Sequence, residues 1–407
     1  MVNAVKIYKP LLRATMRLAG LTPQKIEVEP GTVMNIWAPT RSKKNANNSK
    51  KPAVVFLHGF FADGILTWQF QVLALARDYA VYVPDLLFFG GSSTGDGRRT
   101  VGFQAECLAR GLAKLGVQQC TVVGFSYGAV VAFRLAELQP ELVESVVATC
   151  SGPVLTESLS RECLERLGFP TWSEFLLPDS ASALKKLLEI SSFHFPILPK
   201  CVFKHALECT FRSNLYTSSL KLLACQDAIT SDDIKLEKSM SGLQQIYAFL
   251  VIGRQVMFDF RKERAELLEA LVIPDEDFAF PRHYATTYSI TTNKLADKIV
   301  YTKWTHIIRV YARLSQTILL LVIFVECSGN RPMIDMIFLQ KVYLVWGEND
   351  RIFPLEVAQS LKENLGDNAT LVCIEKAGHI VAVERPFVYN KCLKKILASI
   401  YKAGHTK

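Results

Sequence analysis

Among its ten cysteines the sequence has no pair spaced as Cys-x-x-Cys, a spacing that zinc sites and redox-active dithiols commonly use. Several cysteines instead lie within apolar runs, as Cys120, Cys150 and Cys373 do. In that setting a cysteine behaves as a small buried apolar side chain, and it persists as a free thiol in a reducing compartment. The sequence therefore predicts neither a metal site nor a disulfide framework, and it favours an intracellular, cytoplasmic protein.

Long apolar segments are also missing. The longest apolar run, Thr317–Val325, is much shorter than the roughly 20 residues that a membrane-spanning helix requires. The N-terminus lacks the apolar core of a secretory signal, because four basic residues interrupt the apolar ones between positions 6 and 17. We therefore expect neither a transmembrane helix nor a secretory signal peptide.

Residues 2–20 instead have the pattern of a basic amphipathic helix, with Val5, Leu12, Met16 and Ala19 near one face. Such a helix either packs on the body of the protein or lies on a membrane surface. Peripheral membrane contact through residues 2–20 is therefore the alternative to simple packing.

A nucleic-acid partner is not expected, although the formal net charge is +9. The basic residues are scattered, and their densest cluster lies between positions 41 and 51 in a stretch rich in Asn and Ser. No aromatic residues interleave with this cluster, whereas surfaces that bind single strands combine basic and aromatic side chains. We interpret the cluster as a solvated loop.

Half of the residues are apolar, enough for a large core, and their pattern predicts an α/β fold. Residues 25–150 begin with a hairpin that turns at Pro30-Gly31, and apolar strands then alternate with helices, one of them predicted at Trp68–Tyr79. The same alternation returns from residue 339 to 407. Alternation of this kind is typical of a mostly parallel sheet with helices on both faces. We therefore assign residues 25–150 and 339–407 to one core, preceded by the N-terminal helix within 1–24.

The alternation fails between residues 151 and 338. This stretch contains helix-like pieces, such as Ser158–Leu167, Ala183–Ile190 and Arg261–Leu271, separated by Pro and Ser. The simplest interpretation is a helical cap inserted into the sheet domain.

Residues 124–128 read Gly-Phe-Ser-Tyr-Gly, a G-x-S-x-G motif that follows a predicted strand and precedes a predicted helix. That context is typical of a nucleophile elbow, in which Ser126 sits on a sharp turn at the edge of the sheet. Gly124 and Gly128 leave room for the neighbouring backbone. We predict that Ser126 is the nucleophile.

A serine hydroxyl needs a base, and the base needs an acid to orient it. Asp350 follows the predicted strand that ends at Trp346, and His379 follows the strand that ends at Ile374. Because parallel strands end at the same edge, the sequence predicts a triad of Ser126, His379 and Asp350. Glu348 is the rival acid.

The segment His58-Gly59-Phe60-Phe61 follows the strand Ala53–Leu57, so it is placed to complete an oxyanion hole. We predict that the backbone N–H groups of Phe60 and Tyr127 form this hole. Phe61 is the alternative to Phe60. His58 and Asp85 are expected to hold their loops by hydrogen bonds.

These features together resemble the α/β-hydrolase superfamily, and most closely its plant-type esterases and lipases. The motifs that carry the resemblance are His58-Gly59-Phe60, Pro84-Asp85, Gly124–Gly128, Gly347–Asp350 and Gly378-His379. The resemblance implies an eight-stranded sheet with a helical cap over the serine. Residues 209–255 and 282–338 have no counterpart in it, and they are either cap elaborations or translated non-coding sequence.

The resemblance implies a serine hydrolase that acts on a small-molecule ester and needs no metal or organic cofactor. A serine at the elbow excludes the relatives that use an aspartate there, such as epoxide hydrolases. Cap aromatics, among them Phe175, Phe193 and Phe195, suggest an apolar acyl or alcohol part, although they equally fit a cap core. Two alternatives remain: a carbon–carbon bond hydrolase acting on a diketone-like substrate, and a small-ligand binding protein with little turnover.

Overall fold

The computed structural model describes residues 4–40, 51–194, 260–275 and 340–403. The apolar run Thr317–Val325, the unmatched segments 209–255 and 282–338, and Phe195 lie outside these residues, as does most of the basic cluster at 41–51. None of the described helices combines the length and the apolar character that crossing a membrane would require.

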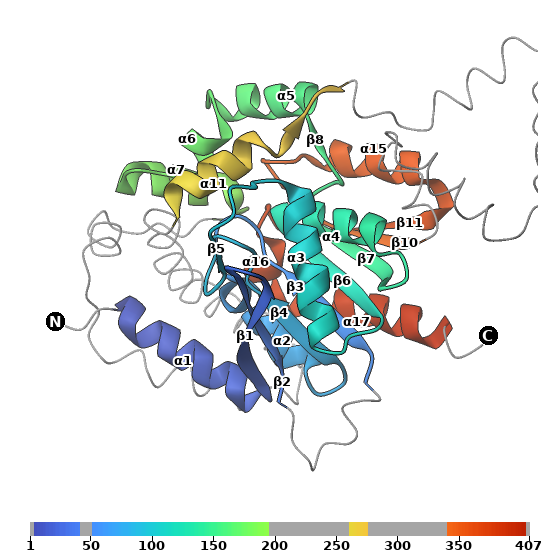
Figure 1. Cartoon of the computed structure of the whole chain (residues 1–407). Helices are drawn as coiled ribbons and strands as arrows, with labels where there is room; N and C mark the ends of the chain where they lie inside the picture. Colours follow the sequence, from blue (N-terminus) through green and yellow to red (C-terminus); the bar gives the residue numbers. More distant parts are fainter. Residues whose placement is uncertain (1–3, 41–50, 195–259, 276–339, 404–407) are drawn as a thin grey trace, which may run out of the picture.

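One twisted sheet organises the described part of the chain (Figure 1). Its main path has eight strands in the order β1-β2-β4-β3-β6-β7-β10-β11, and a short β5 pairs with β2. The strands are β1 (Leu21–Glu29), β2 (Thr32–Pro39), β3 (Ala53–Leu57), β4 (Ala80–Pro84), β5 (Ser93–Thr94), β6 (Cys120–Phe125), β7 (Val143–Thr149), β10 (Lys341–Gly347) and β11 (Ala369–Ile374). The sheet therefore has nine strands rather than the eight expected, because β5 adds to the main path.

All strand pairs from β4 to β11 are parallel, and antiparallel pairing is confined to the contacts of β2 with β1, β4 and β5. The central strands β3 and β6 are apolar and buried almost throughout, as expected for strands covered on both faces. The predicted fold class, a mostly parallel α/β sheet, is confirmed.

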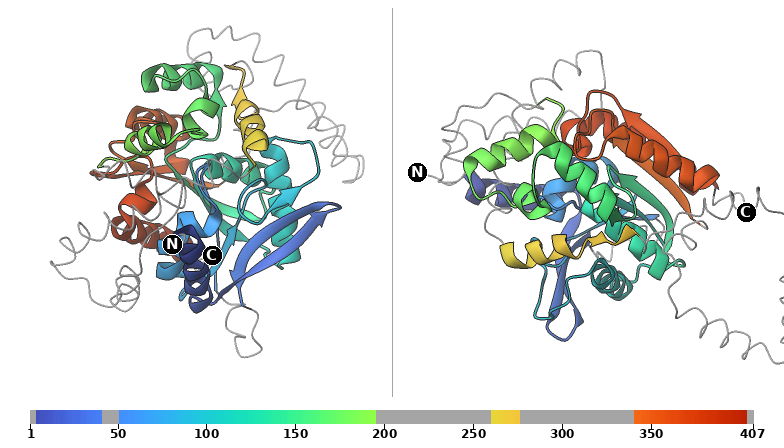
Figure 2. Two further views of the ribbon diagram at one scale, coloured as in Figure 1. Left: turned by 90° about the vertical axis from the view of Figure 1, so that its left-hand side faces the viewer. Right: turned by 90° about the horizontal axis from the view of Figure 1, so that it is seen from above.

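Helices cover both faces of the sheet (Figures 1 and 2). On one face α3 (Val101–Lys114) packs against α4 (Tyr127–Leu138), and on the other α2 (Gly64–Leu75) packs against α17 (Pro386–Ala403). The predicted helix at Trp68–Tyr79 begins earlier, at Gly64, because the Asp63 side chain accepts a hydrogen bond from the Leu66 N–H and caps it. Helix α15 (Leu355–Leu365) connects β10 to β11.

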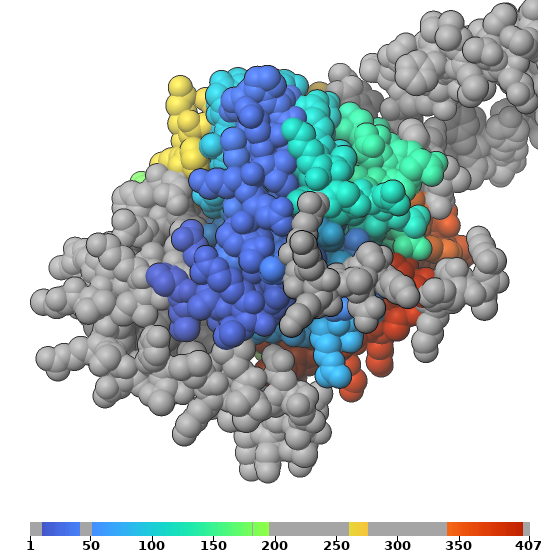
Figure 3. All heavy atoms as spheres, turned by 60° about the horizontal axis from the view of Figure 1, so that its bottom comes forward, coloured from blue at the N-terminus to red at the C-terminus, as the bar shows by residue number. Residues whose placement is uncertain are grey.

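The N-terminal helix α1 (Ala4–Leu18) packs on the body of the protein. Leu12 and Met16, two members of its predicted apolar face, are buried in the core, whereas Leu18 is exposed. The sheet then begins at Leu21, before the predicted boundary at residue 24. Figure 3 shows the N-terminal residues, in blue, along one face of the molecule, with the β1–β2 hairpin beside α3.

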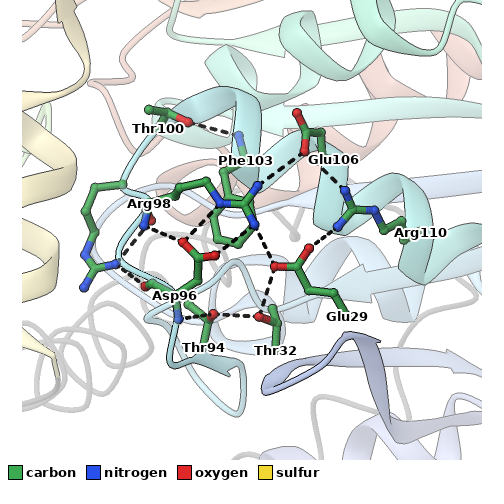
Figure 4. A network of polar contacts seen from close by, with 10 residues as sticks. Glu29, Thr32, Thr94, Asp96, Arg98, Thr100, Phe103, Glu106 and Arg110 are labelled. Atoms are coloured by element: carbon green, nitrogen blue, oxygen red, sulfur yellow. Dashed lines mark hydrogen bonds and ion pairs between the residues drawn. The ribbon is translucent and has the colours of Figure 1, made fainter.

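A network of ion pairs ties the β1–β2 hairpin to α3 (Figure 4). Arg98 binds Glu29 and Asp96 at 2.8 and 2.9 Å, and Arg110 of α3 binds the other oxygen of Glu29. These side chains are partly exposed, so solvent screens the pairs and each contributes little to stability. The network therefore fixes the orientation of the hairpin more than it stabilises the fold.

The segment predicted as a cap, residues 151–338, contains four described helices, which lie together at one end of the sheet (Figures 1 and 2). They are α5 (Glu157–Leu167), α6 (Trp172–Leu176), α7 (Ala181–Ser191) and α11 (Arg261–Glu269). The cap is not purely helical, because β8 (Leu155–Thr156) pairs in parallel with β9 (Val272–Ile273). The buried Arg264 anchors α11 to the core, since its Nε donates to the Phe88 carbonyl at 3.0 Å and its guanidinium lies over the Phe89 ring.

The cysteines only partly match the expectation of buried thiols. Cys120 and Cys150 are buried, but Cys373 is exposed. Cys373 lies on β11, the last strand of the main path, and none of the described strands covers its outer side.

Candidate active site

Ser126 lies on the sharp turn between β6 and α4, with a φ of 50° and a ψ of −121°. A left-handed φ is strained for a residue with a side chain. The turn is possible because a Cβ on Gly128 would lie 2.4 Å from the Leu57 carbonyl oxygen, and one on Gly124 would lie 2.5 Å from the Gly128 oxygen. Both glycines are therefore required by close backbone approach, as the elbow motif predicted.

The structure brings Ser126, His379 and Asp350 together at one edge of the sheet. The Nε2 atom of His379 lies 3.0 Å from the Ser126 Oγ, and its Nδ1 atom lies 2.8 Å from Asp350 Oδ2. These three residues are far apart in the sequence, and they meet because β6, β10 and β11 run parallel within one sheet.

Both oxygen atoms of the Asp350 carboxylate take part in hydrogen bonds. Its second oxygen, Oδ1, accepts the N–H groups of Ile352 and Phe353 at 2.8 and 3.0 Å. These two bonds fix the orientation of the carboxylate toward the imidazole. The rival acid, Glu348, is exposed to solvent, whereas Asp350 is buried.

The imidazole of His379 is held on its faces as well as at its nitrogen atoms. Its ring centroid lies 5.2 Å from that of Phe125 and 5.7 Å from that of Phe353. Its side chain is 2% exposed. Packing and hydrogen bonding thus hold one ring orientation.

His58 supports the loop that follows β3. Its Nε2 accepts the Leu86 N–H at 2.9 Å, and its Nδ1 lies 2.8 Å from the Gly59 carbonyl oxygen, so Nδ1 carries the proton. Burial lowers the pKa of His58 to about 4. A neutral imidazole with both nitrogen atoms occupied is a structural group.

Asp85 ties three separate segments together. Its carboxylate accepts hydrogen bonds from the Asn35 side chain and from the N–H groups of Gly64 and Gly91, at 2.8, 2.9 and 2.8 Å. Burial, with the nearby charge of Asp63, raises the pKa of Asp85 to about 7. A Cβ on Gly90 would lie 2.2 Å from an Asp85 oxygen, which explains a glycine in the turn.

Phe60 and Tyr127 both border the serine. Their rings meet edge to face with centroids 5.8 Å apart, and both residues line the cavity next to Ser126. In the described part of the chain, neither backbone N–H has an acceptor. The two N–H groups are thus available to a bound ligand.

A cavity of about 560 Å³ opens beside Ser126 and His379. The cap contributes one side of its apolar wall, through Leu155, Leu159, Trp172, Leu176, Leu268 and Leu271, and core residues such as Phe61, Ile352 and Phe353 contribute the other. Of the two interpretations of the cap aromatics, the cap core holds for Phe175, which is buried among Phe169 and Trp172, and Phe193 lies outside the cavity. Three carboxylates, those of Glu162, Asp275 and Glu356, also line the cavity.

One cluster among the described residues has the composition of a metal site, namely Cys150, Asp350 and His379, whose ligand atoms lie within 4.8 Å of one another. Two of these atoms already bind each other, so a cation would have to break the bond between His379 and Asp350. Burial and the neighbouring Asp350 raise the pKa of the Cys150 thiol well above its usual range. The donor set therefore fits a hydrogen-bonded pair beside a neutral thiol better than a metal centre.

Sequence reasoning missed one group that contacts the site, the carboxylate of Glu384. It lies at the end of α16 (Val381–Glu384) and accepts the Gly378 N–H at 2.7 Å, directly before His379. The sequence contains one sign that Glu384 lies near the site, since it is the first acidic residue after His379. Its partners on the cap side, Phe193 and His194, are not predictable from sequence spacing.

Comparison with known proteins agrees with this architecture. Residues 52–189 match the profile of the alpha/beta hydrolase fold family. A pimeloyl-[acyl-carrier protein] methyl ester esterase from Aeromonas hydrophila is 35% identical over 102 residues, which are 25% of this chain and 39% of that protein. The match supports the α/β-hydrolase fold that the sheet and its helices show, and the chain covers well under two thirds of the length of that relative.

Solved structures share this fold. A membrane phospholipase A that is a bacterial virulence factor has a TM-score of 0.58 at 20% identity, covering 98% of this chain and 91% of that one. A 2-hydroxy-6-oxo-6-phenylhexa-2,4-dienoate hydrolase from Rhodococcus sp. strain RHA1 has a TM-score of 0.51 at 16% identity, covering 94% and 99%. At such identities the likeness concerns the fold.

Proposed function

We propose that this protein is a serine hydrolase that cleaves carboxylic esters with an apolar acyl or alcohol part. The observation that carries the proposal is the pair of hydrogen bonds that runs from Asp350 through His379 to Ser126, beside an apolar cavity. The similarity to a methyl ester esterase over 102 residues supports an ester as the substrate.

In the proposed reaction, His379 Nε2 takes the proton of the Ser126 hydroxyl as the oxygen attacks the ester carbonyl. Asp350 keeps Nδ1 protonated and stabilises the imidazolium that forms. His379 then protonates the leaving alcohol, and an acyl group stays on Ser126. Water repeats the same steps on the acyl-enzyme and releases the acid.

The negative charge on the substrate oxygen needs donors that are in place before the reaction. We assign this role to the backbone N–H groups of Phe60 and Tyr127, which border the cavity. Tyr127 is the first residue of α4, so the positive end of the helix dipole lies at the same point. Removal of one such donor costs about 10²–10³-fold in rate in related chemistry.

The substrate assignment follows from the cavity. Its volume of about 560 Å³ accommodates a small molecule, and its cap wall is formed by leucines and Trp172. We propose that the apolar part of the ester lies against this cap wall, while the carbonyl lies between Ser126 and the two N–H donors.

A fluorophosphonate probe tests the proposal. We expect covalent labelling of Ser126 in the wild-type protein, no labelling in Ser126→Ala, and unchanged labelling in Ser93→Ala, an exposed serine of β5. Turnover of short apolar esters should fall by about 10⁴–10⁶-fold in Ser126→Ala, as in other triads. Full activity of Ser126→Ala would reject the proposal.

Turnover assays separate the two alternatives, a binding protein and a carbon–carbon bond hydrolase. A binding protein would take up esters without releasing acid, and a carbon–carbon bond hydrolase would cleave a diketone-like substrate faster than an ester.

A cytoplasmic location is a further proposal, and cell fractionation tests it. The buried Leu12 and Met16 favour packing of α1 over membrane contact, and fractionation tests this as well.

A further inference from the structure

The carboxylate of Glu384 joins two parts of the protein that are distant in sequence. Its Oε2 accepts the Gly378 N–H at 2.7 Å, and its Oε1 accepts the N–H groups of Phe193 and His194 at 2.8 and 3.0 Å. Gly378 precedes His379, whereas Phe193 and His194 follow α7 of the cap. One side chain thus connects the histidine loop to the end of a cap helix.

The two segments also touch directly. The Ile380 N–H donates to the Ser191 carbonyl at 3.2 Å, on the other side of His379 from Gly378. A Cβ on Gly378 would lie 2.7 Å from both the Phe193 nitrogen and the Ser191 oxygen. The backbone of the histidine loop is therefore in contact with the backbone that leaves α7.

Burial makes these bonds important for the loop. Glu384 is 4% exposed, and its three donors are backbone N–H groups. Burial raises the pKa of Glu384, while the three N–H donors favour its ionised form and oppose that rise. Without the carboxylate, three N–H groups would lose their acceptor in a site with little access to water, which is costly.

Different groups hold the ring of His379 and the loop that carries it. Asp350, Phe125 and Phe353 fix the ring. The position of the backbone on which the ring is carried depends on the loop that Glu384 holds. A displacement of about 1 Å would lengthen the 3.0 Å contact between His379 and Ser126 beyond hydrogen-bonding range.

We propose that Glu384 is a positioning residue, whose carboxylate clamps the His379 loop to the cap segment 191–194, so that docking of the cap and placement of the imidazole occur together. The inference rests on the proposed function of His379 as the general base. Glu384 acts through the loop and does not touch the reacting atoms.

Glu384→Gln tests this with little change of shape. An amide has one accepting oxygen, so either the Gly378 N–H or the pair from Phe193 and His194 would face an NH₂ group. We expect kcat and the rate of fluorophosphonate labelling to fall together by about 10–100-fold, as for misplacement of a catalytic group by about 1 Å. KM should stay within about twofold, because the cavity walls are unchanged.

Glu375→Gln is the matched control, since Glu375 lies in the same loop but is exposed. It should behave as wild type. A Glu384→Gln protein with control-like kcat and a lowered melting temperature would show a structural role alone, and would overturn the proposal. If Glu384→Gln does not fold, Glu384→Asp retains the charge on a shorter side chain, and it should give an intermediate loss of kcat with the same constancy of KM.

Hydrogen–deuterium exchange separates failure of this inference from failure of the proposed function, because it needs no turnover. Peptides that contain residues 191–194 and 378–380 should both exchange faster in Glu384→Gln than in Glu375→Gln. Unchanged exchange in either segment would reject the clamp even in a fully active enzyme. Faster exchange in both segments of a protein that hydrolyses no ester would retain the clamp and reject the hydrolase.

Discussion

The Nδ1 atom of His379 lies 2.8 Å from Asp350 Oδ2, and the two side chains are 2% and 0% exposed. They follow neighbouring parallel strands, β10 and β11, so the sheet itself sets their separation. A buried carboxylate in this position orients the imidazole and stabilises its cation.

Asp350→Asn should therefore lower kcat by about 10⁴-fold by comparison with other triads, because an amide can present its NH₂ group to Nδ1 and favour the wrong tautomer. Steady-state kinetics on an apolar ester measures this loss. The control is Glu348→Gln, which changes an exposed carboxylate two positions away and should leave kcat within about twofold. If the two variants lost activity in the reverse order, Glu348 would be the acid.

This part of the site was open to prediction because each of the three residues lies shortly after the end of a strand. A parallel sheet brings strand ends to one edge, so strand order and chain order suffice for Ser126, Asp350 and His379. The cap was not predictable in the same way. Its strands β8 and β9 are two residues long and more than a hundred positions apart, and so short a pairing leaves no periodic signal.

The residues that form the cavity wall were not predictable for a related reason. The aromatic character of Phe175 and Phe193 fits a cavity wall and a cap core equally, and the contacts that α6 makes decide which residues face inward. Trp172 and Leu176 of α6 line the cavity, whereas Phe175 turns into the cap. Which face of a short helix points toward a cavity depends on tertiary packing that spacing alone does not encode.

The close backbone approach at Gly128 predicts a specific loss. In Gly128→Ala the new methyl group would lie 2.4 Å from the Leu57 oxygen and 2.5 Å from the His58 oxygen. Both are backbone atoms, so they cannot move aside as the end of a flexible side chain can. We expect destabilisation of about 1–3 kcal/mol in urea unfolding, and slower fluorophosphonate labelling because the Phe60 loop is displaced. Gly97→Ala adds a methyl group with nothing within 4 Å and should be close to neutral. Equal stabilities of the two variants would contradict the role assigned to Gly128.

His58 predicts a pH dependence of stability. Burial lowers its pKa from 6.5 to about 4, so between these values the unfolded chain takes up a proton that the folded protein does not. The free energy of unfolding should therefore decrease as the pH falls from 6.5 to 4, by about 3 kcal/mol at most from this residue. Asp85, with a raised pKa, contributes in the opposite direction.

The comparison of wild type with His58→Gln isolates the histidine, because Asp85 is common to both proteins. The glutamine carbonyl can accept the Leu86 N–H but does not titrate. Urea unfolding at several pH values should show His58→Gln less stable than wild type at pH 7, with the difference narrowing toward pH 4. A difference that stays constant over this range would mean that His58 titrates normally in the folded protein.

The carboxylates around the cavity predict a preference for the charge of the substrate. Glu162, Asp275 and Glu356 line it, and none of the described lining residues is a lysine or an arginine. An ester with a carboxylate at its far end should therefore have a lower kcat/KM than a neutral ester of the same size, and an ester with a trimethylammonium group a higher one. Since these carboxylates are exposed to solvent, we expect differences of about three- to tenfold, which shrink as salt is added.

The variant Glu356→Gln should narrow the gap between the cationic and the anionic ester without changing turnover of the neutral one. Glu165→Gln is the control, because Glu165 is exposed on α5 and does not line the cavity. Glu162 is a weaker choice for the test, since Arg166 lies 3.9 Å away and partly offsets its charge. A preference for the anionic ester in wild type, retained in Glu356→Gln, would show that the field at the serine is set by groups other than these carboxylates. It would then favour substrates that carry an acid group.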